Sequence, residues 1–288
     1  MTEKSGSRGS VQVDGAVLQY CVEGEGRPAL VIGSATYYPR TFSRRLRESL
    51  QLAFVDARHF AKVDGSRHAD SISLDIYLED IDRVRARLRM ERAVIIGHSH
   101  HGNLALEYAK RYPARASELV LIGSPPVEVS RIMEAAETYW AEHASENRKA
   151  VLQRRLDALE TGALEGMASS EAFVARYVAE APKYWYEPAF DASHLWQGMP
   201  INMEVIRVFR DFFANGYRME WDSEQLPAPV LAVMGRHDYA VPPILWDEVR
   251  PRLKNLSFHL FDHSGHTPQL EEPQHFDRTL LEWLGQPA

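Results

Sequence analysis

Short apolar segments alternate with amphipathic segments along this chain. The apolar segments are continuous, as parallel strands buried on both faces must be, and they cover residues 29–33, 52–56, 93–97, 118–123 and 230–235. The amphipathic segments place apolar residues at helical spacing with charged residues on the other face, and they cover residues 41–50, 73–88, 104–112 and 243–253. Strands that alternate with helices predict an α/β fold with a mostly parallel, doubly wound sheet.

The two ends of the chain add elements to this sheet. They are expected to be strands at residues 11–13, 16–23 and 256–261 and a closing helix at residues 276–284. Asp14 and Gly15 form a dipeptide typical of a hairpin turn between the first two strands. The polar start of the chain, residues 1–10, is expected to be disordered.

The alternation stops over residues 125–226. Helical spacing continues inside this stretch, at residues 132–160 and 171–178. An insertion between two core strands predicts a helical lid on a core made of residues 11–124 and 227–288. A lid needs a hydrophobic core of its own, so most of its aromatic residues are expected to pack together. Trp185 and Trp196 are the candidates among them for contact with a substrate.

Composition narrows the class of protein. The 288 residues carry a net charge of −7, which argues against nucleic acid or an anionic membrane as the main partner. Cys21 is the single cysteine, so an intramolecular disulfide cannot form. No signal peptide and no apolar run of roughly 18 residues is present. We therefore expect a soluble, cytoplasmic monomer or homodimer whose partner is a small molecule or a short peptide.

The residues around Ser99 indicate a nucleophile. The sequence Gly97-His98-Ser99-His100-His101-Gly102 follows a predicted buried strand and precedes a predicted helix. A strand, a sharp turn and a helix are the context in which a serine hydroxyl is raised above the edge of a sheet. Serine is a weak nucleophile at neutral pH, so it needs a general base and an acid that orients the base.

Two later residues fit these roles. Asp238 follows the strand at residues 230–235, and His266 follows the strand at residues 256–261. The carboxyl ends of parallel strands lie at one edge of a sheet, where ligands bind. The order serine, aspartate, histidine is the one expected for this architecture. The sequence therefore predicts a catalytic triad of Ser99, Asp238 and His266.

These motifs resemble the lidded α/β-hydrolase family. The matching segments are G-H-S before a helix, G-R-H-D-Y-A-V-P around Asp238 and S-G-H-T-P-Q-L-E-E-P around His266. The resemblance covers the chain from about residue 11 onward and is closest to the branch described as proline-iminopeptidase-like. It implies a serine mechanism without a cofactor, with the family's nucleophile, acid and base at Ser99, Asp238 and His266.

The sequence departs from the family pattern at two positions. The family has a small residue two positions after the nucleophile, where this chain has His101, and glycine is favoured where backbones pack closely. The family's first oxyanion-hole strand ends in His-Gly, whereas here Gly33 is followed by Ser34. An oxyanion hole needs backbone N–H groups, so the expected donors are those of Ser34 and His100.

Several histidines and one charged pair allow other interpretations. His59, His98, His100, His101, His237 and His263 lie in strand-end loops or at the nucleophile, but their spacing matches no zinc pattern, and no metal is expected. One or two of them, His101 in particular, are candidates for substrate contact. Asp56 and Arg58 resemble a family loop in which a carboxylate and a guanidinium brace the loops beneath the site.

Three functions remain open from the sequence. The first is hydrolysis of a small ester or amide through an acyl-enzyme, including aminopeptidase activity, which requires a carboxylate to hold the substrate's ammonium group. Glu204 is the main candidate for that carboxylate because of its apolar surroundings in sequence; the other candidates are Glu134, Glu137 and Glu187. The second is hydrolysis of a carbon–carbon bond. The third is a slow-turnover ligand-binding receptor or pseudoenzyme.

Overall fold

The computed structural model describes residues 6–63, 69–159, 166–222 and 224–286. The described residues form a nine-stranded sheet with strand order β1-β2-β4-β3-β6-β7-β8-β9 and with β5 paired to β2. The strands are β1 (Ser7–Val13), β2 (Ala16–Glu23), β3 (Arg27–Gly33), β4 (Leu50–Asp56), β5 (Lys62–Val63), β6 (Ala93–His98), β7 (Ala116–Ile122), β8 (Val230–Gly235) and β9 (Leu256–Phe261). The pairs that contain β2 are antiparallel, and the run from β4 to β9 is parallel.

The predicted strands are confirmed, and β1 is longer than expected. It begins at Ser7 and pairs with β2 from Ser7 opposite Val22 to Val13 opposite Ala16. Residues 7–10 therefore belong to a strand, and the expectation of disorder over residues 1–10 was wrong for them; residues 1–5 lie outside the described residues. Hydrophobicity gave no signal because most side chains of β1 are exposed or half-buried, and backbone hydrogen bonds hold this edge strand.

Helices cover the sheet and fill the stretch between β7 and β8. In chain order, those of the described residues are α1 (Leu74–Arg87), α2 (His100–Arg111), α3 (Val129–His143), α4 (Glu146–Ala158), α5 (Ser169–Ala179), α6 (Ala181–Tyr184), α7 (Ser193–Trp196), α8 (Met203–Asp211), α9 (Pro268–Glu271) and α10 (Pro273–Trp283). The long helix expected at residues 132–160 is two helices, because the chain turns at Ala144 and Ser145. The hydroxyl of Ser145 accepts the backbone N–H of Arg148 and starts α4 afresh.

Two of the expected helices are not α-helical. Residues 41–50 form a 3₁₀ turn at Arg45–Glu48 before β4. The Arg47 guanidinium there donates to the carbonyls of Phe42 and Pro39, which holds the chain in a compact loop. Residues 243–253 form 3₁₀ turns at Pro243–Trp246 and Arg250–Arg252. Their prolines lack the N–H that a continuous α-helix requires.

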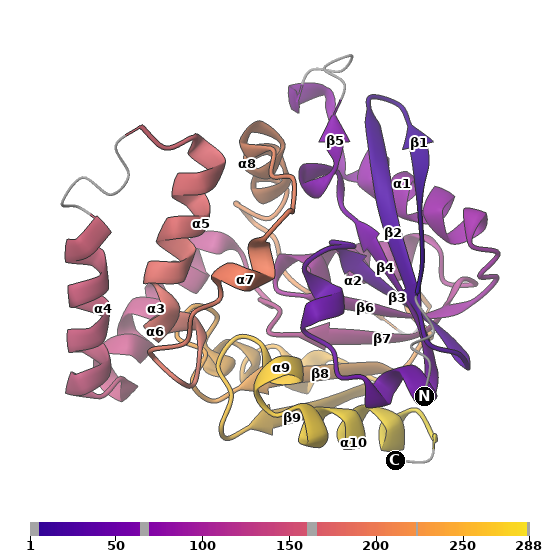
Figure 1. Cartoon of the computed structure of the whole chain (residues 1–288). Helices are drawn as coiled ribbons and strands as arrows, with labels where there is room; N and C mark the ends of the chain where they lie inside the picture. The colour runs from indigo at the N-terminus through magenta and orange to yellow at the C-terminus, as the bar shows by residue number, and fades with distance from the viewer. Residues whose placement is uncertain (1–5, 64–68, 160–165, 223, 287–288) are drawn as a thin grey trace.

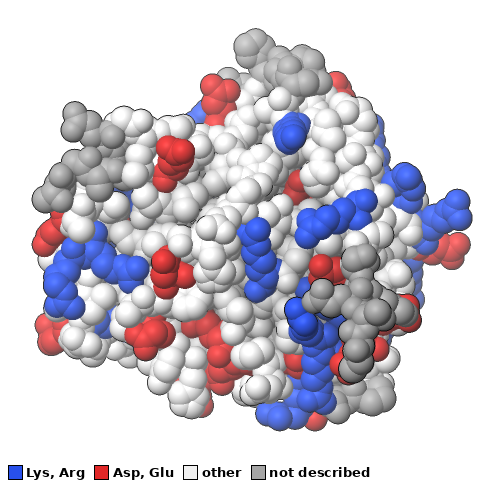
Figure 2. All heavy atoms as spheres, viewed as in Figure 1, with Lys and Arg blue, Asp and Glu red and all other residues white. Residues whose placement is uncertain are grey.

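Helices α3 to α8 lie in the chain between β7 and β8, the stretch for which a lid was predicted. Figure 1 shows them gathered on one side of the molecule, with α1 and α2 elsewhere around the sheet. Figure 2 has the viewpoint of Figure 1, and it shows acidic and basic side chains interspersed over the face that is turned to the viewer. In the described part of the chain, no helix combines the length and the apolarity that crossing a membrane requires.

Candidate active site

Ser99 occupies a sharp turn between β6 and α2. Its backbone has φ 55° and ψ −137°, a conformation that non-glycine residues seldom adopt. The turn is held by the Ser99 N–H, which donates to Ile122 at 2.8 Å, and by the Gly102 N–H, which donates to the Ser99 carbonyl at 2.9 Å. The strained serine backbone is therefore fixed by strand β7 and by the first turn of α2.

The close contacts of this turn fall on Gly97 and Gly102. A Cβ on Gly97 would overlap the backbone of His101, and one on Gly102 would overlap the side chain of Ser124. The ring of His101 is buried and hydrogen-bonds to Tyr38 and His59. The histidine at this position is thus compatible with the turn, because the glycine one residue later provides the close approach.

His266 and Asp238 are hydrogen-bonded to each other beyond the ends of β9 and β8. The distance from His266 Nδ1 to Asp238 Oδ2 is 2.7 Å. Asp238 is fully buried, and its other oxygen accepts the N–H groups of Val241 at 2.7 Å and Ala240 at 3.1 Å. With both oxygens engaged, the carboxylate has one orientation, and its bond to Nδ1 fixes the orientation of the imidazole ring.

A carboxylate that sequence reasoning missed holds the loop of His266. Glu271 accepts N–H groups from Gly265 and Thr267, both at 3.0 Å, and from Tyr186 at 2.6 Å. Burial raises the pKa of Glu271 to about 7. Its signal was present in the sequence as the glutamate of the S-G-H-T-P-Q-L-E segment.

Ser99 and His266 line a common cavity of about 380 Å³. Its wall contains further aromatic and aliphatic residues from the core and from the helices between β7 and β8. The main ones are Tyr37, Tyr38, Phe60, Ile132, Phe173, Tyr177, Tyr184, Met199, Ile206 and Phe209. Among the described residues of the wall, Arg210 is the one Lys, Arg, Asp or Glu. The described wall is therefore mostly apolar, and its cationic side chain, Arg210, is also exposed to solvent.

The structure brings four other candidates to this cavity. Ser34, His100, His101 and Trp196 all line it. Ser34 is next to the nucleophile because Ile32 of β3 pairs with Gly97 of β6, so the two strands end side by side. The Ser34 hydroxyl accepts the N–H groups of the two residues that begin the next turn, at 3.1 and 3.0 Å, and so shapes the loop that follows β3.

Two polar atoms in this wall lack a protein partner. Among the described residues, nothing hydrogen-bonds to His100 Nε2 or to Trp196 Nε1, although both atoms are buried. Burial lowers the pKa of His100 to about 4, and the nearby Arg210 adds to this effect. A neutral imidazole and an indole N–H are thus free to bond polar atoms of a ligand.

The structure leaves two candidates outside the cavity. Glu204 lies on the exposed side of α8, and the helical period turns its neighbours Val205 and Ile206 inward instead. Trp185 is buried and packs against Phe190, with ring centroids 4.4 Å apart. Neither is among the described wall residues. The other acidic candidates, Glu134, Glu137 and Glu187, are also exposed.

The described residues contain no group of three or more His, Cys, Asp or Glu side chains that could hold a metal ion. The Asp56 loop makes structural contacts instead. Asp56 accepts the N–H groups of Ala35 and Gln19, at 2.7 and 3.1 Å, and burial raises its pKa to about 7. Arg58 pairs with Asp80 at 2.8 Å. The pair braces neighbouring loops as expected, through separate partners rather than with each other.

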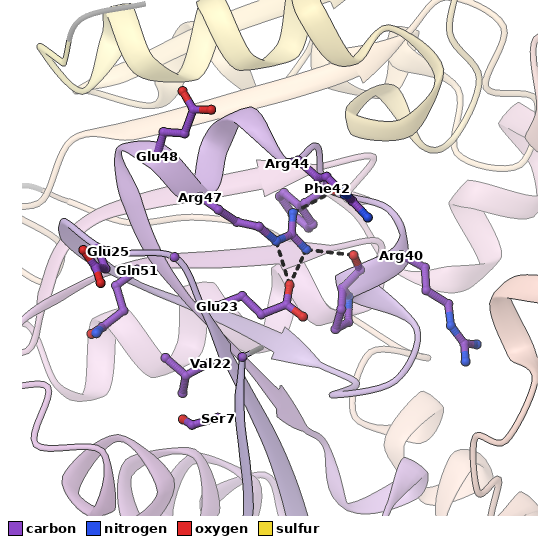
Figure 3. Close-up of a pocket in the computed structure, with 13 residues that line it drawn as sticks. Ser7, Val22, Glu23, Glu25, Arg40, Phe42, Arg44, Arg47, Glu48 and Gln51 are labelled. Carbon is purple, nitrogen blue, oxygen red and sulfur yellow. Dashed lines mark hydrogen bonds and ion pairs between the residues drawn. The ribbon is translucent and has the colours of Figure 1, made fainter. Parts of the chain in front are cut away.

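A second, larger hollow of about 1090 Å³ shares no described residue with this cavity. Figure 3 shows its wall, which mixes acidic and basic side chains of β2 and the segment before β4. Arg47 crosses it and pairs with Glu23 at 2.5 Å. Without a nucleophile–base pair, this hollow is not the candidate active site.

Comparison with known proteins adds independent information. A family profile described as "alpha/beta hydrolase fold" matches residues 42–273. The chain is 36% identical to the AB hydrolase superfamily protein YclE of Bacillus subtilis, over 95% of this chain and 97% of that protein. It is 28% identical to a 2-hydroxymuconate semialdehyde hydrolase of Pseudomonas putida, over 92% of this chain and 89% of that protein.

More distant similarities point to the same fold. The chain is 24% identical to the proline iminopeptidase PfmaB of Pestalotiopsis fici, over 91% of this chain and 94% of that protein. An alpha/beta fold family hydrolase of Bacillus anthracis has a similar structure, with a TM-score of 0.71 at 17% identity, covering 96% of this chain and 99% of that one.

Proposed function

Because the chain belongs to the α/β-hydrolase family, we propose that it is a serine hydrolase that cleaves esters or amides through an acyl-enzyme on Ser99. The observation that supports this most is the shared cavity of Ser99 and His266, in which Asp238 bonds the far nitrogen of the imidazole at 2.7 Å. An imidazole held in this way presents an unprotonated Nε2 toward the serine.

In this mechanism the Ser99 hydroxyl attacks the substrate carbonyl and its proton passes to His266 Nε2. Asp238 stabilises the imidazolium that results. The backbone N–H groups of Ser34 and His100 bind the oxyanion of the tetrahedral intermediate. His266 then gives the proton to the leaving group. In the second half of the reaction, water attacks the acyl-enzyme while His266 accepts its proton, and His266 returns that proton to Ser99 as the acid product leaves.

The test is covalent labelling followed by turnover. A fluorophosphonate should label the wild-type chain once, at Ser99, and p-nitrophenyl esters should give a burst followed by steady release of p-nitrophenol. Ser99→Ala should abolish both, whereas Ser169→Ala, which alters an exposed serine, should abolish neither. A burst without steady turnover would favour a slow-turnover receptor, and labelling of another serine would refute the proposal.

The walls of the cavity favour an apolar substrate that carries an anionic group. Arg210 supplies the positive charge, and His100 Nε2 and Trp196 Nε1 supply unpaired polar atoms. No described wall residue is acidic, so the described wall offers no negative charge to a substrate ammonium group. We therefore propose an anionic rather than an amino-terminal substrate, and Glu204 is not part of the site.

A pair of esters tests this preference. One has an acyl chain that ends in a carboxylate, and the other has the same chain ending in a carboxamide. The wild type should prefer the carboxylate about 10-fold in kcat/KM, in line with a charge-assisted hydrogen bond, and Arg210→Gln should remove the preference through KM. Arg207→Gln is the matched control, because Arg207 and Arg210 are both exposed arginines of the same helix, and Arg207 is not among the described wall residues. Preference for a free α-amine would contradict the proposal.

Carbon–carbon bond hydrolysis is the second candidate function. The observation that favours it is Arg210, because an exposed arginine that lines an otherwise mostly apolar cavity suits an acidic ketone as well as an acidic ester. The similarity to a 2-hydroxymuconate semialdehyde hydrolase agrees with this. Turnover of 2-hydroxymuconate semialdehyde faster than of every ester tested would favour the second candidate over the first.

A further inference from the structure

Five buried side chains beside Ser99 are joined end to end by hydrogen bonds that finish on the backbone of His266. The contacts in order are Tyr77 Oη to His59 Nδ1 at 2.9 Å, His59 Nε2 to His101 Nε2 at 3.0 Å, His101 Nδ1 to Tyr38 Oη at 2.8 Å, Tyr38 Oη to His98 Nδ1 at 3.3 Å, and His98 Nε2 to the His266 carbonyl oxygen at 2.8 Å. We call these five side chains the imidazole–phenol chain.

The last contact fixes the direction of the others. A carbonyl oxygen only accepts, so His98 Nε2 carries the proton and His98 Nδ1 accepts from the Tyr38 hydroxyl. Tyr38 has a single proton, so His101 Nδ1 must donate to Tyr38 Oη. His101 Nε2 then accepts from His59 Nε2.

Because the proton of the neutral His59 ring lies on Nε2, His59 Nδ1 accepts a hydrogen bond from the hydroxyl of Tyr77. Every bond therefore points toward the His266 carbonyl, and each imidazole is neutral with one defined tautomer. Burial favours this neutral state: it lowers the pKa of His59 and of His98 to about 3 and that of His101 well below its ordinary value. A second proton on His101 Nε2 would oppose the proton of His59 Nε2, and a second proton on His98 Nδ1 or His59 Nδ1 would leave the tyrosine hydroxyl that donates there without its acceptor.

The imidazole–phenol chain connects the segments whose relative positions matter for the proposed reaction. Tyr38 belongs to the loop after Ser34, His98 and His101 flank Ser99, and the chain ends on His266. The two donors of the proposed oxyanion hole, the N–H groups of Ser34 and His100, lie on separate segments. The geometry of the hole therefore depends on the distance between those segments. The Tyr38–His101 bond spans them directly.

The imidazole–phenol chain also contacts α8, one of the helices between β7 and β8. The Phe209 ring of α8 lies on the rings of His59 and His101, with centroid distances of 4.4 and 5.6 Å. The backbone N–H of Asn202, at the start of α8, donates to the His59 carbonyl at 2.9 Å. The position of α8 is thus tied to the same side chains that hold the oxyanion loop.

We propose that the imidazole–phenol chain is a positioning device that holds the oxyanion loop, the nucleophile turn and the loop of the general base in register with α8. Its members are positioning residues, and they act on the Ser99 reaction through the Ser34 and His100 N–H groups and through His266. The inference rests on the proposed function for its kinetic consequence, whereas the protonation pattern of the chain is independent of it.

The protonation pattern can be read by ¹H–¹⁵N NMR of the histidine rings in the wild-type protein. We expect neutral rings with the proton on Nε2 in His59 and His98 and on Nδ1 in His101. Any other pattern among these three, or a charged ring at pH 7, would overturn the chain whether or not the protein is an active hydrolase. Absence of Ser99-dependent turnover with this pattern intact would instead refute the proposed function and, with it, the positioning role.

The kinetic test removes one hydroxyl from the middle of the chain. Tyr38→Phe should lower kcat about 10-fold or more with KM nearly unchanged, because small displacements of reacting groups cost large factors in rate. It should weaken binding of a trifluoromethyl ketone, which forms the oxyanion, by a similar factor. Tyr77→Phe, outside the cavity wall, should shift both quantities in the same direction by about 3-fold.

The matched control is Tyr108→Phe. Tyr108 is a buried tyrosine of α2 whose hydroxyl donates to Asp82 at 3.0 Å, so its loss tests the effect of a deleted buried hydroxyl alone. It should alter thermal stability but neither kcat nor the affinity for the ketone. The double variant Tyr38→Phe/Tyr77→Phe should be no slower than Tyr38→Phe, because the chain is already broken.

Equal effects of Tyr38→Phe and Tyr108→Phe, a kcat for Tyr38→Phe within two-fold of the wild type, or additive losses in the double variant would each refute the positioning role. If Tyr38→Phe does not fold, Tyr77→Phe decides: unchanged kcat and ketone affinity in a folded Tyr77→Phe protein would overturn the proposal.

Discussion

Substitution of Asp238 by asparagine probes the orientation of His266 with almost no change in shape. One oxygen of Asp238 accepts two backbone N–H groups, those of Val241 and Ala240, and the other accepts His266 Nδ1–H. An asparagine has one oxygen and one NH₂ group for these two positions. If its oxygen keeps the backbone bonds, its NH₂ faces Nδ1, and the ring must carry its proton on Nε2, where it cannot accept one from Ser99.

The alternative orientation places the NH₂ group against two backbone donors in a fully buried site. Each donor without an acceptor costs about 1–3 kcal/mol, so this orientation is disfavoured by about 2–6 kcal/mol in total. At about 1.4 kcal/mol for each factor of ten, the productive tautomer becomes rare. We expect kcat/KM to fall about 10³-fold with the fold intact.

The assay is steady-state hydrolysis of the best p-nitrophenyl ester, with thermal unfolding measured in parallel. Asp262→Asn is the control, because Asp262 lies in the loop before His266 but is exposed and pairs with Arg236; its activity should stay within two-fold of the wild type. A loss of less than 10-fold for Asp238→Asn, with normal stability, would show that Asp238 does not select the tautomer of His266.

Three further predictions concern the nucleophile turn, a buried histidine and metal dependence. Gly97→Ala should fail to form the nucleophile turn, since its Cβ would overlap the backbone of His101; a stable, active variant would contradict this close contact. Burial lowers the pKa of His59 from 6.5 to about 3. Between pH 6.5 and pH 3 the unfolded chain binds a proton at His59 that the folded state lacks. The stability that the buried neutral ring contributes above pH 6.5 is therefore lost as the pH falls. His59→Gln should therefore be less stable than the wild type at pH 7, and chemical unfolding should show the gap narrowing by about 1 kcal/mol or more at pH 5; a constant gap would contradict the assignment. Activity should survive dialysis against EDTA, and a loss restored by zinc would show that a metal takes part.

The sequence was sufficient for features that depend on neighbouring residues. Continuous apolar runs predicted the buried strands, because a parallel strand covered on both faces has no polar side to show. Ser73 was placed correctly at the start of the helix at Leu74–Arg87, where its hydroxyl accepts the N–H of Ile76. The location of Ser99, Asp238 and His266 at one edge of the sheet could be predicted, because each follows a strand and parallel strands end at one edge.

Local patterns failed where other segments set the outcome. The amphipathic residues 41–50 do not form an α-helix, since the Arg47 side chain bonds the carbonyls of its own loop. The apolar neighbours of Glu204 suggested a buried carboxylate, but a helix that buries Val205 and Ile206 turns the residue before them outward.

Only the tertiary structure decided which polar groups meet. The imidazole–phenol chain joins residues from four separate segments of the sequence, and its directions follow from the carbonyl at its end. The cationic character of the cavity rests on Arg210, which no motif marked. Sequence patterns record the periodicity and turns of single elements, whereas hydrogen bonds between distant segments depend on how those elements pack, which the order of residues does not display.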